Sequence, residues 1–82
     1  MDNKRIAVVG IVISSQEQVV SKVNDILSKH AINIVGRMGV PKPEKGFSVI
    51  ALIVEGTTDE IGALTGKLGN VKGVKVKSAV TS

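Results

Sequence analysis

Two runs of eight residues, Ile6–Ile13 and Phe47–Val54, are apolar at nearly every position and rich in β-branched side chains. A strand with one wet face alternates apolar and polar residues, whereas a strand covered on both faces is apolar at both sets of positions. Each run therefore predicts a central strand of a sheet whose two faces are both shielded from water. The fold must therefore place these two strands in the middle of the sheet and cover both faces of the sheet there.

Each apolar run is followed by the start of a helix. The segment Ser14–Gln18 contains two Ser-x-x-Glu/Gln pairs and Thr57–Glu60 contains Thr-x-x-Glu, which is the spacing of a capping box. The apolar residues that follow recur at steps of three and four, as on the buried stripe of a helix. They are Val19, Val20, Val23, Ile26 and Leu27 in the first segment and Ile61, Leu64 and Leu68 in the second. We expect two helices that pack on the sheet, the first capped by Ser14 or Ser15.

Two further segments alternate with period two and complete the sheet. One runs from Ile34 to Pro41, and the other is Val74–Val80. The charged and proline-containing stretch Pro41–Gly46 predicts an exposed turn between antiparallel strands. The order βαββαβ is that of the ferredoxin-like fold, of the α+β class, with a four-stranded antiparallel sheet and two helices on one face. We expect a single domain over residues 1–82.

The face of this sheet without helices would expose a contiguous apolar patch, because both central strands are apolar on both sides. Monomers rarely tolerate such a patch, so we expect a homo-oligomer, either a dimer or a tetramer. The alternative is that sheet twist and the long stems of Lys75 and Lys77 shield the face within one chain.

Few residues in the chain suit catalysis or metal binding. There is no cysteine and one histidine, His30, so a thiolate nucleophile or a His-rich metal site within one chain is excluded. The adjacent acids Asp59 and Glu60 lie where a helix start favours negative charge. We expect no enzymatic activity, no cofactor and no metal; a metal at His30 would need ligands from other chains.

The basic balance of the chain suggests nucleic acid as a partner, but the residue pattern does not favour it. Eleven basic residues against seven acidic ones give a formal net charge of +4, yet the lysines are scattered along the chain. RNA-binding proteins of this fold stack bases on aromatic side chains, and Phe47 is the only aromatic residue. The apolar run near the start is too short to span a membrane and lacks a cleavage context. We expect a cytoplasmic protein with no membrane partner.

The stretch Gly36-Arg37-Met38-Gly39 is unusual for a strand. Glycines inside a strand mark a bulge or a close approach by another backbone or a ligand. The guanidinium of Arg37 presents a planar fork of donors that suits a carboxylate. Equally, Arg37 could pair with an acid of a neighbouring subunit while the glycines admit tight strand pairing.

Several segments together resemble a known family. They are Lys4–Val8, Ile34–Pro41 with its Gly-Arg-Met-Gly, Gly56–Gly69 with its Gly-Thr-Thr-Asp-Glu, and Val74–Ala79. In these the chain is similar to small stand-alone ACT-like proteins described as regulators of the iron-only hydrogenase system, which are related to the C-terminal domain of nickel-responsive repressors. The resemblance implies an ACT-like domain that assembles through its sheets. It further implies a small ligand, such as an amino acid, bound between subunits near Ile13, Ser14 and Ser15. A nickel site is not expected, since the repressors use several histidines and a cysteine.

The leading hypothesis is a non-enzymatic regulatory module that senses a small ligand between subunits and acts through a protein partner. Its expected ligand-binding residues are Ser14, Ser15, Gly36, Arg37, Met38 and Gly39. Two alternatives stay open, a ligand-free oligomeric interaction domain and, less favoured, a nucleic-acid binder.

Overall fold

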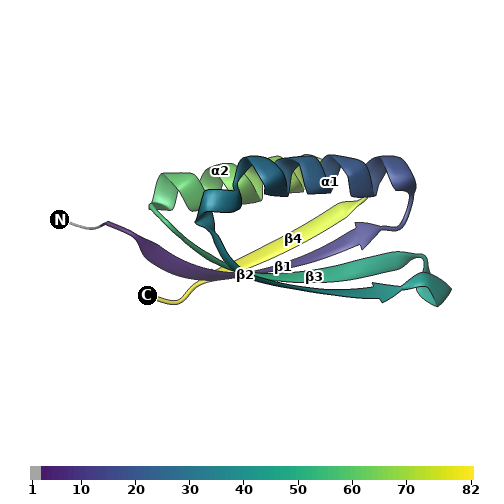
Figure 1. Ribbon diagram of the computed structural model, residues 1–82, viewed down its shortest axis with the longest axis horizontal. Coiled ribbons are helices and arrows are strands. Elements are labelled where there is room, and N and C mark those ends of the chain that lie inside the picture. Colours follow the sequence, from purple (N-terminus) through teal and green to yellow (C-terminus); the bar gives the residue numbers. More distant parts are fainter. Residues whose placement is uncertain (1–2) are drawn as a thin grey trace.

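Four antiparallel strands and two helices make up the computed structural model, which describes residues 3–82 (Figure 1). Met1 and Asp2, which the expected domain includes, lie outside the described residues. The sheet order is β2-β3-β1-β4, so the two apolar runs form the central strands, as predicted. The elements are β1 (Arg5–Ser14), α1 (Glu17–Lys29), β2 (Ile34–Lys42), β3 (Phe47–Gly56), α2 (Thr58–Gly69) and β4 (Val74–Val80), with short 3-10 turns at Ala31–Asn33 and Pro43–Lys45. The ferredoxin-like fold is confirmed.

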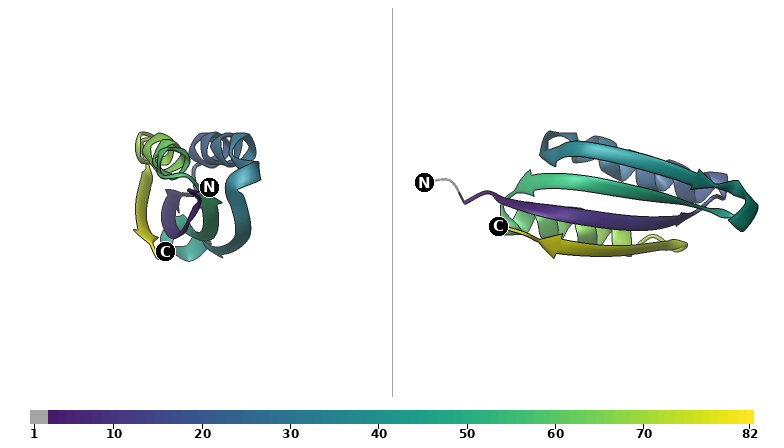
Figure 2. Two further views of the ribbon diagram at one scale, coloured as in Figure 1. Left: turned by 90° about the vertical axis from the view of Figure 1, so that its left-hand side faces the viewer. Right: turned by 90° about the horizontal axis from the view of Figure 1, so that it is seen from below.

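Both helices lie side by side on one face of the sheet, and in the part of the chain that the structure describes no helix covers the other face (Figure 2). The core between the two layers is built from every second residue of the central strands and from the apolar stripes of the helices. Its buried side chains are Ala7, Val9, Ile11, Ile13, Val19, Val23, Leu27, Ile50, Leu52, Val54, Ile61, Leu64 and Leu68. The remaining residues of the central strands point away from the helices, onto a face that one chain leaves open.

The two helices begin differently, although the sequence shows similar capping patterns before both. Thr57 caps α2 in a full capping box: its hydroxyl accepts from the Glu60 amide at 3.1 Å, and the Glu60 carboxylate accepts from the Thr57 amide at 2.7 Å. The predicted cap of α1 is wrong. The N-cap is Gln16, with no side-chain cap, because β1 continues through Ser14, which is still paired with Phe47.

A β-bulge near the start of β2 decides which way its residues point. Ile34 pairs with Val54 and Gly36 pairs with the next residue along β3, Ile53, so Val35 is the extra residue between them. The bulge lets Ile34 pack against the core while Gly36 takes the opposite face, since an extra residue shifts the alternation by one. The glycine-rich stretch therefore does mark a bulge, as one of its interpretations predicted.

The turn after β2 starts later than expected. β2 continues through Pro41 to Lys42, which a proline allows because β2 is an edge strand and needs no hydrogen bond from that nitrogen to a neighbour on its outer side. A 3-10 turn over Pro43–Lys45 follows, and Gly46 with φ +76° closes it. Only glycine adopts this left-handed backbone without strain.

Candidate functional site

The four residues of the Gly36–Gly39 stretch lie on both faces of the sheet. Arg37 pairs with Leu52, and Gly39 pairs with Ile50. The side chains of Leu52 and Ile50 are buried on the side of the sheet that the helices cover. Gly36 and Met38 alternate with them and therefore belong to the open face. The structure thus brings Arg37 and Gly39 together on the helix side and places Met38, 67% exposed, on the other.

Arg37 and Gly39 line a cleft between α1 and the edge strand β2, which we call the α1–β2 cleft. It has a volume of about 250 Å³, and its remaining lining residues are Ile13, Val20, Val23, Asn24, Val40, Pro41, Ser48, Val49 and Ile50. Ile13, Val23 and Ile50 are buried, so the inner part of the cleft is aliphatic. Within residues 3–82, no aspartate or glutamate belongs to the lining.

Asn24 positions the guanidinium of Arg37 in this cleft. One terminal nitrogen, Nη2, of Arg37 donates to the Oδ1 atom of Asn24 at 3.2 Å. Asn24 is the site residue that sequence reasoning missed. The signal was its spacing, since it follows Val20 by one helical turn and so occupies the border of the apolar stripe of α1.

Ser14 and Ser15 lie elsewhere in the same chain. Arg37 pairs with Leu52 of β3, and Leu52 pairs in turn with Val9 of β1. Ser14 lies five residues beyond Val9 along β1. At about 3.3 Å per residue that separation is about 16 Å along the strand. The Ser14 amide already donates to the Gly73 carbonyl at 2.9 Å and the Ser15 amide to the Gly46 carbonyl at 3.1 Å. The hydroxyl groups are therefore what these residues offer to an anion.

The open face carries an apolar surface across three strands. Its larger exposed side chains are Ile6, Val8 and Val12 from β1, Ile53 from β3, and Met38 and Val40 from β2. In register, Ile53 lies between Gly36 and Val8, while Ala51 lies between Met38 and Gly10. Lys75 and Lys77 occupy the β4 edge, paired with Val12 and Gly10. Within residues 3–82, the predicted apolar patch therefore exists and is half exposed, despite the lysine stems.

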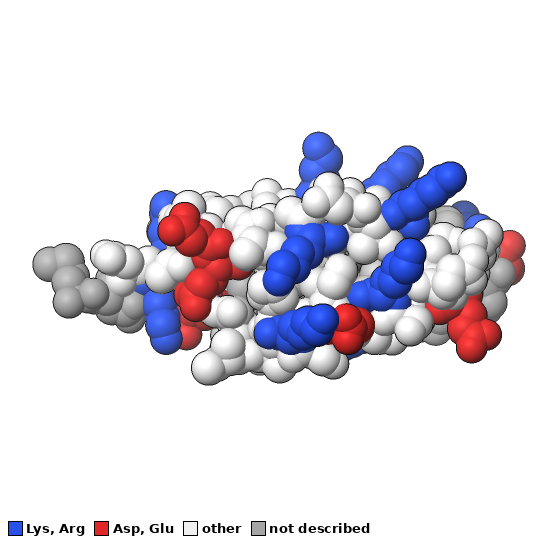
Figure 3. Space-filling view, turned by 90° about the horizontal axis from the view of Figure 1, so that it is seen from above, with Lys and Arg blue, Asp and Glu red and all other residues white. Residues whose placement is uncertain are grey.

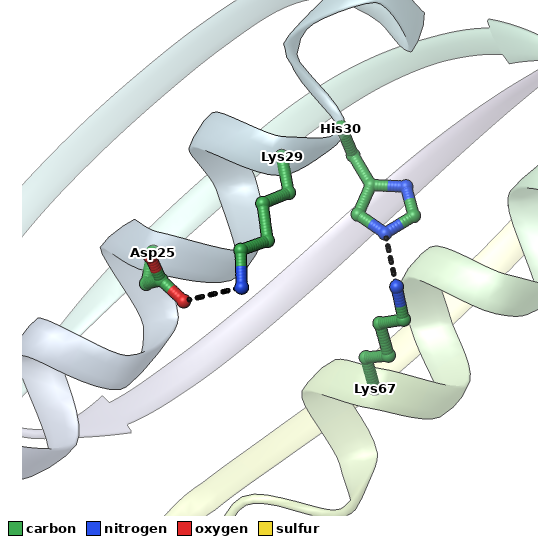
Figure 4. A network of polar contacts seen from close by, with 4 residues as sticks. All are labelled: Asp25, Lys29, His30 and Lys67. Carbon is green, nitrogen blue, oxygen red and sulfur yellow. Dashed lines mark hydrogen bonds and ion pairs between the residues drawn. The ribbon is translucent and has the colours of Figure 1, made fainter.

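His30 lies at the end of α1 beside α2, where its Nε2 atom is 3.3 Å from the Nζ atom of Lys67 (Figure 4). Partial burial and the nearby Lys67 charge lower the pKa of His30. Asp25 forms an ion pair with Lys29, with Oδ2 and Nζ 3.2 Å apart (Figure 4). Among the described residues no group of three potential metal-binding side chains occurs.

Charge on the helix side is mixed rather than gathered in one patch. Basic side chains are spread across the helix layer, with acidic side chains among and beside them (Figure 3). No helix within the described part of the chain is long and apolar enough to cross a membrane.

Comparison with known proteins identifies the family to which this chain belongs. The family model described as "TM1266-like: Iron-only hydrogenase system regulator, putative" matches residues 5–78. The solved structure of the uncharacterized protein TM1266 from Thermotoga maritima is 35% identical with a TM-score of 0.94, over 96% of this chain and 99% of that chain.

Two more distant structures share the fold alone. The ACT domain from GTP pyrophosphokinase of Chlorobium tepidum is 23% identical with a TM-score of 0.76, over 99% of this chain and 92% of that chain. The C-terminal domain of the MgtC protein from Mycobacterium tuberculosis is 11% identical with a TM-score of 0.71, over 99% and 92%. No curated protein matches the chain.

Proposed function

Because the chain belongs to the TM1266-like family, we propose that it is a regulatory module that works as a homo-oligomer and senses a small ligand at a site between subunits. It catalyses no reaction on that ligand and passes its state to a protein partner. The observation that carries the proposal is the half-exposed apolar surface of the open face. A second copy of the chain covers it.

The exposed apolar side chains of the open face support an oligomer, because their burial against a second copy would release the water around them. Val8, Val12, Met38, Val40 and Ile53 are 38–67% exposed in one chain. Fully burying a side chain of this kind stabilises by about 1.5–3 kcal/mol, so covering what remains exposed on these five gives about 4–7 kcal/mol per chain. That gain is comparable to the whole stability of a small domain, which favours association.

Strand β2 links the open face to the ligand. Its alternate residues project to opposite sides, with Met38 towards the proposed subunit contact and Arg37 and Gly39 into the α1–β2 cleft. Gly36 leaves room for Ile53, whose Cδ1 atom would lie 3.7 Å from a Cβ at that position. A ligand that shifts β2 therefore changes the surface that the neighbouring subunit contacts.

The separation of Ser14 and Ser15 from Arg37 in one chain supports a site shared between subunits. The α1–β2 cleft reaches from Arg37 to Ile13, but Ser14 lines a different hollow, together with Val19 and Lys22. A ligand in the cleft that also touches Ser14 and Ser15 therefore takes these serines from a neighbouring copy. Their hydroxyls then hydrogen-bond the ligand while Arg37 supplies the counter-charge.

Mixing two inactive variants tests the shared site. Ligands are first found by thermal shift. A compound at one hundred times its Kd adds about 2.7 kcal/mol, which raises Tm by about 10–20 °C for a chain of this size. Arg37→Ala and a double Ser14→Ala, Ser15→Ala variant should each lose the shift. Hybrid oligomers made by refolding the two together should regain part of it, because some sites then receive Arg37 from one variant and the serines from the other.

Hybrids that stay inactive while each parent folds would contradict a shared site. A ligand-free interaction domain is the second candidate, favoured by the same apolar face. It predicts an oligomer with no thermal shift for any amino acid, carboxylate or metal. Nucleic-acid binding predicts duplex affinity that falls steeply with salt, and we expect none.

A further inference from the structure

We propose that the α1–β2 cleft of a single chain binds a small aliphatic carboxylate that carries no ammonium group. This inference rests on the proposed function and names the chemical class of the ligand. In it, the cleft is the part of the sensing site that one chain supplies.

The polar end of the cleft suits a carboxylate. The guanidinium of Arg37 offers donors in a planar fork, of which one N–H is directed to Asn24, and a guanidinium fork matches two carboxylate oxygens. The Asn24 amide also carries an NH₂ group that donates hydrogen bonds. Ser48 of the neighbouring strand β3 also lines the cleft, but it is paired with Ile13 and lies four residues from the Leu52 that pairs with Arg37. The donors at the polar end are therefore the guanidinium of Arg37 from the sheet and the amide of Asn24 from α1.

The inner end of the cleft suits an aliphatic tail. Its lining there comes from Ile13, Val20, Val23 and Ile50, which are branched aliphatic side chains without polar atoms. The volume of about 250 Å³ lies below the range of about 300–1,000 Å³ that is usual for drug-sized ligands. A short branched chain fits this space, whereas a nucleotide does not.

The absence of acidic side chains from the lining argues against an α-amino acid. None of the described residues that line the cleft is an aspartate or a glutamate, so the ammonium group of an amino acid would lose water without gaining a counter-charge from them. It would also lie close to the positive charge of Arg37. A carboxylate with no amino group, such as a branched-chain fatty acid or the related 2-oxo acid, avoids both penalties.

Gly39 keeps the cleft open. Gly39 is an exposed residue of the edge strand β2 that lines the cleft, and a Cβ atom built there meets none of the surrounding atoms within 4 Å. A side chain at position 39 would fit the strand and project into the empty volume. Gly39→Val therefore tests occupancy without a clash in the fold.

Titration with isovalerate, followed by amide NMR shifts and calorimetry, tests the proposal. We expect saturable binding with shifts at Asn24, Arg37 and Gly39. Leucine, which adds the ammonium group, and 3-methylbutan-1-ol, which lacks the carboxylate, should bind at least about tenfold more weakly. Arg37→Gln should weaken isovalerate binding about tenfold or more, as expected for a hydrogen bond to a charged group. Gly39→Val should abolish it.

Two controls match these variants. Lys22→Gln removes one positive charge from the same helix layer, but Lys22 does not line the cleft. Gly62→Val adds the same side chain at an exposed glycine of α2, where a Cβ also meets nothing within 4 Å. Both controls should keep the affinity of each chain for isovalerate.

Three results would overturn the proposal. Leucine binding as tightly as isovalerate would show that the ligand class is wrong, while the proposed sensing function stands. Equal losses in Arg37→Gln and Lys22→Gln would mean that general charge, not the cleft, attracts the anion. If hybrid oligomers form and respond to another compound but isovalerate does not bind, the proposal for the cleft is wrong and the proposed shared site stands.

Discussion

Replacing Ile53 by lysine should dissociate the proposed oligomer without unfolding the chain. Ile53 is on the central strand β3, points to the open face and is 48% exposed. Covering the rest of this side chain stabilises by about 1 kcal/mol per copy, which the variant loses. A lysine buried at the same place costs several kcal/mol more per ion. A dimer carries two copies, so the loss is at least about 4 kcal/mol, equivalent to about a thousandfold rise in Kd.

Sedimentation velocity over a wide concentration range measures this rise, and circular dichroism checks the fold. The matched control is Ile32→Lys, because Ile32 is 93% exposed and lies in the 3-10 turn after α1, away from the open face. We expect the control to keep the wild-type molar mass. The reasoning is refuted if Ile53→Lys keeps the wild-type mass at every concentration, since the open face would then not be the subunit contact.

Three further predictions concern the chain itself. Leu52→Ala removes a fully buried side chain on the helix side of β3. It should lower the free energy of unfolding, measured by urea titration, by about 2–5 kcal/mol. A loss below about 1 kcal/mol would contradict the position of Leu52 in the core. Thr57→Ala should cost about 1 kcal/mol. The hydrogen bond from the Thr57 backbone amide lowers the pKa of Glu60. The stability that this carboxylate contributes is therefore present above its ordinary pKa and is lost as pH falls through the lowered pKa. Glu60→Gln should remove this part of the pH dependence of the free energy of unfolding. Burial and then Lys67 lower the pKa of His30, so stability falls as pH drops below about 6.5, and Lys67→Gln should raise the pKa of His30 in an NMR titration.

The sheet order and the second helix could be predicted from sequence because local and tertiary signals agree there. Phe47–Val54 is apolar on both sides because it is a central strand, and Thr57–Glu60 forms the capping box that its spacing indicates. At Ser14 the two signals compete. Pairing with Phe47 extends β1 through the serine that the pattern assigned to a cap, and no local rule states which of the two interactions wins.

The candidate site was less accessible from sequence. Arg37 could be singled out by residue type, but the side it faces depends on the bulge at Val35, which shifts the alternation of β2 by one residue. Asn24 borders the apolar stripe of α1, but its hydrogen bond to Arg37 joins α1 to β2. A contact between two different elements has no spacing along the sequence that would indicate it.

The molar mass of the wild-type protein, measured by light scattering from micromolar to nanomolar concentration, tests the central claim most directly. An oligomer that persists through the micromolar range is the predicted result, because a second copy then covers the apolar side chains of β1, β2 and β3. A stable particle with the mass of one chain at every concentration would contradict it, and the shared ligand site would fall with it.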